Sequence, residues 1–67
     1  MNMDNFYKGE FVHLLIDTAH KLECVRDNIK NHPKGNSVYG AKSKDYINGA
    51  VRKIRELSYR ILDGKED

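Results

Sequence analysis

The sequence predicts an all-α protein: a two-helix antiparallel hairpin that pairs with a second copy to form a four-helix bundle. Two long segments carry apolar residues every three or four positions, which is the spacing of amphipathic helices. A turn-forming segment separates them. The chain has 67 residues, a length at which one chain buries only a marginal core.

The first helix is expected from about residue 10 to about residue 31. On a helical wheel, one stripe of side chains there falls within about 40° of a single direction. Its members are Phe11, Leu15, Thr18, Leu22, Val25 and Ile29. Pro33 disfavours helical geometry at the preceding residue, so the helix should end just before it. We expect this stripe to pack against the second helix.

The second helix is expected from about residue 44 to about residue 62. Ser43 suits its N-cap, because a serine hydroxyl accepts hydrogen bonds from free backbone N–H groups. Gly64 suits the position just after its end, where helices favour glycine. The matching apolar seam consists of Ile47, Ala50, Ile54, Leu57 and Ile61.

A long connection, residues 32–42, is expected between the helices, because it contains Pro33, Gly35 and Gly40. Residues 1–5 and 64–67 are expected to be flexible tails flanking a single domain.

A homodimer follows from apolar arcs that are wider than a lone hairpin can cover. Val12 and Ile16 lie beside the first stripe, and Val51, Leu62 and Tyr59 lie beside the second. The single cysteine excludes an internal disulfide that could compensate for a small core. A partner surface, most simply a second copy, would cover the excess.

The composition indicates the compartment in which the protein is expected. Charged residues make up 33% of the chain, and the longest apolar run, residues 14–16, is far too short to span a bilayer. No basic segment followed by an apolar run opens the chain, so no signal peptide is expected. With one unpaired cysteine, these features favour a cytoplasmic protein without membrane partners.

One polar stripe of the first helix contains metal-ligand residue types. They are His13, Asp17, His20 and Cys24, spaced by three and four residues. Such groups can bind zinc, but successive helical turns lie about 5.4 Å apart and one helix rarely directs four ligands to one point. A solvated polar face is therefore favoured, and neither a metal nor a cofactor is expected.

Catalysis is not expected. His20 and Cys24 resemble a base and a nucleophile only in residue type, since a working pair also needs a pocket and an oxyanion site.

The second helix is basic, with six cationic residues against two acidic ones between residues 42 and 62, a net of +4. The cations are Lys42, Lys44, Arg52, Lys53, Arg55 and Arg60. A basic helix can lie on a phosphate backbone, so a nucleic-acid-associated protein is the alternative reading.

The preferred hypothesis is that the chain is a small non-catalytic regulatory or inhibitory protein, of the kind found among bacterial and phage regulators. It would act by helix-mediated binding to a larger protein, as a homodimer. The expected contact residues are Val38 and Tyr39 in the connection, with Arg52, Arg55 and Tyr59 on the second helix.

Overall fold

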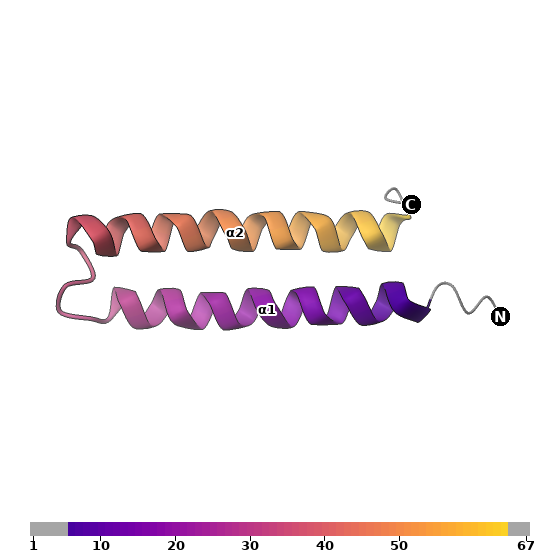
Figure 1. Cartoon of the computed structure of the whole chain (residues 1–67), viewed down its shortest axis with the longest axis horizontal. Coiled ribbons are helices and arrows are strands. Elements are labelled where there is room, and N and C mark those ends of the chain that lie inside the picture. The colour runs from indigo at the N-terminus through magenta and orange to yellow at the C-terminus, as the bar shows by residue number, and fades with distance from the viewer. Residues whose placement is uncertain (1–5, 65–67) are drawn as a thin grey trace.

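The computed structural model describes residues 6–64 as two antiparallel α-helices lying side by side (Figure 1). Helix α1 spans Phe6–Lys30 and helix α2 spans Val38–Asp63. The helical hairpin expected from the sequence is confirmed, and no strand occurs within residues 6–64. The expected tail at 1–5 and all of the expected tail at 64–67 except Gly64 lie outside the described residues.

Helix α2 begins six residues earlier than the sequence led us to expect. Ser37, not Ser43, is its N-cap: its backbone is extended, and its hydroxyl accepts a hydrogen bond from the N–H of Gly40 at 3.1 Å. The connection is therefore residues 31–37, and the expected boundaries of 32–42 for the loop and 44 for the helix were wrong. Val38 and Tyr39 lie in the first turn of α2, not in a loop.

The short connection packs directly beneath the first turn of α2. The N–H of Gly35 donates to the carbonyl of His32 at 2.8 Å, and the N–H of Lys34 donates to His32 Nδ1 at 2.9 Å. A Cβ on Gly40 would press on the backbone of Gly35 and lie 2.7 Å from the carbonyl oxygen of Lys34. Glycine at position 40 is therefore required for this close approach, and its presence in the helix is not a turn signal.

The other helix ends agree better with expectation. Gly64 adopts the left-handed conformation, with φ of 72°, and its N–H donates to the carbonyl oxygens of Arg60 and Ile61. This is the C-terminal glycine geometry that the sequence predicts. At the start of the chain, α1 begins at Phe6, about four residues before the expected position.

Small side chains fill the interface between α1 and α2. Ala19 and Ser58 are fully buried, and Val51 is 7% exposed. The Ser58 hydroxyl donates to the carbonyl of Ile54 at 2.9 Å, so its burial leaves no unpaired polar atom. Larger side chains such as Leu15, Leu22 and Ile54 are only half-buried around this centre.

The apolar stripe expected to face α2 is only partly turned toward it: Leu15, Leu22 and Ile29 are half-buried. Phe11 is 51% exposed, Val25 46% and Leu57 41%. Val12 and Ile16, expected at the margin of the stripe, are half-buried beside Ala19. A hairpin gives each helix only one neighbour, so a wide apolar arc cannot be buried throughout, and the row of small residues permits the closest approach.

Candidate functional site

One broad side of the hairpin carries most of its large exposed apolar side chains. We call it the open face and define it by six residues exposed by 41% to 82%: Phe11, Leu14, Val25, Tyr39, Tyr46 and Leu57. At about 100° per residue, its three members on α1 fall within about 60° of one another, and its three on α2 within about 20°.

Two shallow hollows on the open face join the helices. Near the start of α1, a hollow of about 330 Å³ is lined by residues of both helices: Phe11, Leu14, Leu15, Leu57 and Ile61. Near the connection, a hollow of about 420 Å³ is lined by Val25 and Ile29 of α1 and by Tyr39 and Ser43 of α2. The apolar surface therefore continues from one helix to the other at both ends of the hairpin.

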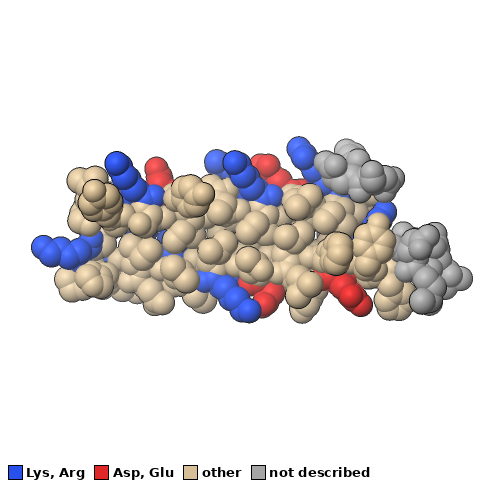
Figure 2. Space-filling view, viewed as in Figure 1, with Lys and Arg blue, Asp and Glu red and all other residues tan. Residues whose placement is uncertain are grey.

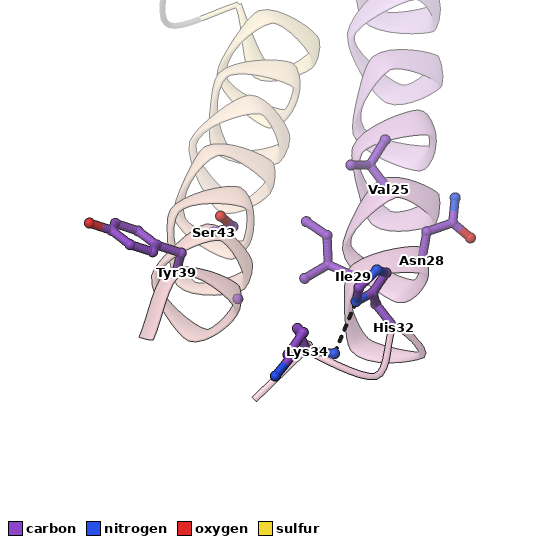
Figure 3. A pocket seen from close by; sticks show the side chains of 9 residues that line it. Val25, Asn28, Ile29, His32, Lys34, Tyr39 and Ser43 are labelled. Atoms are coloured by element: carbon purple, nitrogen blue, oxygen red, sulfur yellow. Dashed lines mark hydrogen bonds between the residues drawn. The ribbon is translucent and has the colours of Figure 1, made fainter. Parts of the chain in front are cut away.

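Figure 3 shows the hollow beside the connection from close by. The Ile29 side chain points toward α2, whereas the Tyr39 ring points away from α1 toward the surroundings. The dashed line marks the hydrogen bond that holds the His32 ring against the backbone N–H of Lys34, at 2.9 Å. At this end of the open face, the Ile29 side chain lies between the helices and the Tyr39 ring projects outward at the border.

Charged side chains line the long edges of the open face and leave its middle uncharged (Figure 2). We call the first edge, on α1, the α1 edge; it carries Glu10, Asp17 and Lys21, and Lys21 Nζ lies 3.1 Å from Asp17 Oδ2. The second, the α2 edge, carries Lys42, Lys53 and Arg60, all exposed. The α1 edge has a net charge of −1. Acidic side chains also lie among the cations along α2 (Figure 2), and Glu56 is about 40° from Arg60 around the helix.

The opposite side of the hairpin, the polar side, is defined by Glu23, Arg26, Asn48 and Arg55. Arg55 Nη2 donates to Glu23 Oε1 at 2.9 Å, and Arg26 Nη1 donates to Asn48 Oδ1 at 2.8 Å. Each bond joins one helix to the other. The polar side therefore holds the helices in register with directional bonds, which the sequence reasoning did not foresee.

The residues expected to contact a larger partner divide into two groups. Arg52, Arg55 and Tyr59 lie within two turns of α2, at or beside the polar side, although Arg55 is engaged with Glu23. Val38 and Tyr39 lie nearer the start of the same helix, about 20 Å from Arg52 and about 30 Å from Tyr59 at 1.5 Å per residue. The five residues therefore extend over most of the length of α2.

The six cations of α2 do not form one patch. Lys42, Lys53 and Arg60 share the α2 edge, whereas Arg52 projects near the polar side. Lys44 and Arg55 are half-buried, and Lys44 Nζ donates to Asn36 Oδ1 of the connection at 3.2 Å. A phosphate backbone along α2 would therefore meet three of the six.

The metal-ligand residue types remain apart. His13, Asp17, His20 and Cys24 are exposed on the part of α1 that is turned away from α2. His20 Nδ1 lies 3.5 Å from Glu23 Oε1, and Asp17 pairs with Lys21. In the described part of the chain, no three His, Cys, Asp or Glu side chains are grouped so that they could hold a metal ion.

Sequence reasoning placed the apolar excess at Val12, Ile16, Val51, Leu62 and Tyr59. Leu62 and Tyr59 are exposed, whereas Val12 and Ile16 are half-buried and Val51 is buried. Leu14 and Tyr46 belonged to the apolar sets, and only the orientation of the hairpin shows that they are exposed together. Neither α1 nor α2, as described, has a stretch apolar enough for a membrane span. Comparisons with family models, curated proteins and solved structures give no match for this chain.

Proposed function

We propose that this chain is a small non-catalytic regulatory or inhibitory protein that acts by helix-mediated binding to a larger protein, as a homodimer. The open face is the observation that carries the proposal. Contiguous exposed apolar surface of several hundred Å² is uncommon on monomeric proteins and marks interaction sites. Here such a surface runs along both helices and is free of charge in its middle (Figure 2).

The size of the open face supports a stable association. Its six defining side chains are exposed by 41% to 82%. At about 200 Å² for a large apolar residue, they present on the order of 700 Å² to solvent. A standard protein interface buries about 800 Å² on each partner, so the open face is large enough for one.

The small interior of the hairpin also supports self-association, because it contributes little to the stability of a single chain. Among residues 6–64, the buried hydrophobic residues are Ala19 and Val51, both small. Because burial of large apolar side chains is the dominant favourable term in folding, a hairpin that buries only small ones gains substantially by covering its open face.

Association through the open faces would leave the polar sides turned outward, available to a larger protein. Tyr59 is 57% exposed there. Arg52, which lies seven residues earlier and therefore on the same face of the helix, is also exposed. Tyrosine and arginine are enriched among the residues that dominate binding energies. These two side chains are the proposed contact with the larger partner.

The self-association is tested by light scattering of the purified chain at micromolar concentration. A mass of twice 7.8 kDa supports the proposal, and a folded monomer contradicts it. The contact with a larger protein is tested by quantitative affinity purification with the wild type and two variants, Tyr59→Ala and His13→Ala. The proposal requires a protein that is lost with the first variant, is retained with the second, and binds directly when purified.

A nucleic-acid-associated role is the second candidate, supported by the three exposed cations of the α2 edge. Binding through Lys42, Lys53 and Arg60 should neutralise about three phosphates, and the logarithm of the affinity should fall with the logarithm of salt concentration with a slope of about −3. Titration of labelled duplex and single strands at low and moderate salt measures this slope. Absence of binding at low salt contradicts the role.

A further inference from the structure

We infer that His32 makes the connection sensitive to pH: the neutral imidazole holds the connection in place, and protonation of the ring loosens it. The inference concerns a single chain, so it does not depend on the homodimer proposed above. It follows from one hydrogen bond, in which His32 Nδ1 accepts the backbone N–H of Lys34 at 2.9 Å (Figure 3). Only the neutral ring can make this bond, because both ring nitrogens carry a proton in the imidazolium form.

This bond is the first of a series that joins the end of α1 to the start of α2. Lys34 donates its N–H to the His32 ring, and its carbonyl oxygen accepts the N–H of Ser37 at 3.0 Å. Ser37 is the N-cap of α2, and its hydroxyl accepts the N–H of Gly40 at 3.1 Å. Gly40 in turn lies against the backbone of Gly35 in the connection. A change at the His32 ring therefore reaches the first turn of α2 through Lys34.

The residue type at position 32 is what gives this turn its dependence on pH. Pro33 has no N–H, so the N–H of Lys34 is the first that follows His32 along the chain. Asparagine and aspartate side chains commonly accept a hydrogen bond from the backbone two residues further on. Histidine differs from both, because its charge ordinarily changes between about pH 5 and pH 8. The imidazole thus does the work of an asparagine only while it is neutral.

The groups around the ring offer no anion that could hold an imidazolium in the same place. The three α1 residues that line the hollow beside His32 are uncharged, and α2 contributes the hydroxyl of Tyr39, whose ring points away. The connection contributes Lys34, a cation, and among the described residues no carboxylate lines this hollow. The negative end of the α1 dipole favours cations, but Lys30 in the last turn already places one there. A protonated ring would therefore turn out toward water and leave the N–H of Lys34.

Hydrogen exchange measured by nuclear magnetic resonance tests the inference. Protection of the Lys34 N–H, corrected for the intrinsic pH dependence of exchange, should fall about two- to ten-fold as the His32 ring signals change from the neutral to the charged form, since one ordinary hydrogen bond is lost. The N–H of Ser37 should lose protection over the same pH range. His32→Asn keeps an acceptor two residues before Lys34 but does not titrate, so its protection should persist from pH 8 to pH 5.

A second variant, His32→Ala, removes the acceptor without adding a charge, and at pH 8 it should resemble the wild type at pH 5. This comparison decides the question even if asparagine does not replace the imidazole. His13 and His20 are present in the wild type and in both variants, so a loss of Lys34 protection common to all three proteins would come from them and overturn the inference. Protection of Lys34 that stays constant while the His32 ring titrates would overturn it as well.

Discussion

The two long sides of this hairpin are built from the same two helices and stabilised in different ways. On the polar side, Arg55 donates to Glu23 and Arg26 donates to Asn48, so directional bonds cross from helix to helix. On the open face, neighbouring side chains such as Leu14 and Leu57 line one hollow but leave it open. The polar side makes its bonds within one chain, whereas the open face leaves its large apolar side chains exposed.

The difference follows from what each kind of interaction requires. A hydrogen bond needs one donor and one acceptor in a fixed geometry, which two helices can supply. Apolar burial needs enough surrounding surface to exclude water, and two helices enclose only a narrow strip. Ala19 and Ser58 occupy that strip, and the large apolar side chains remain at its border.

The largest expected effect is on the open face. Leu14→Lys places a charge among its apolar side chains, and each dimer would carry two copies of the change. Since burial of one leucine contributes about 1.5–3 kcal/mol, we expect the dissociation constant to rise by more than about 100-fold. Sedimentation equilibrium measures the change. His13→Lys, one position earlier but turned outward, is the control, and an equal effect of both substitutions would contradict the distinction between the two sides.

The next largest effect is expected at the narrow strip of buried small residues between α1 and α2. Ala19→Leu forces extra volume into a fully buried position, which should lower the free energy of unfolding by about 1–3 kcal/mol. Urea denaturation followed by circular dichroism gives the value. His20→Leu, at the adjacent exposed position, should change stability by no more than about 0.5 kcal/mol. An Ala19→Leu variant as stable as the wild type would show that the helices do not pack as closely as described.

Two tyrosines of α2 sharpen the comparison, because the same substitution can be made on each side. Tyr46 is 82% exposed on the open face and Tyr59 is 57% exposed near the polar side. Tyr46→Ala should weaken self-association by about ten-fold, the equivalent of about 1.4 kcal/mol, since the ring would be covered in the dimer. Tyr59→Ala should leave self-association within about two-fold of the wild type. Reversed effects in the sedimentation experiment would place the interface on the polar side.

The smallest effect is expected on the polar side. Glu23→Gln removes one charge from the pair with Arg55, whose side chains are 30% and 32% exposed. Exposed pairs contribute about 0.2–1 kcal/mol, and salt screens them. Unfolding free energies at low and high salt should therefore differ more for the wild type than for Glu23→Gln. An identical salt dependence would mean that this pair does not contribute measurably to holding the helices together.

The sequence was sufficient for the helices but not for their orientation. Spacing of three and four residues identifies α1 and α2, and Gly64 marks the end of the second. It does not determine which part of a wide apolar arc faces the neighbouring helix, because Phe11 and Val12 are equally apolar while only the second is half-buried. That selection depends on where small residues of both helices meet, which is a property of the pair.

The start of α2 was mispredicted for a local reason. Gly40 and Ser43 have the composition of a turn, and Ser43 is an acceptable cap by residue type. In the fold, Ser37 takes the cap and Gly40 serves as a contact surface for the connection. The same error affected the candidate partner residues. Val38 and Tyr39 lie in the first turn of α2 and not in a loop, about 30 Å from Tyr59 along the helix axis.

The antiparallel course of α1 and α2 places Phe6 and Asp63, the outermost residues of the two helices, at the same end of the hairpin (Figure 1). The connection alone occupies the opposite end. The two ends of the molecule therefore differ in kind: one presents two helix ends, and the other presents a single closed turn of chain.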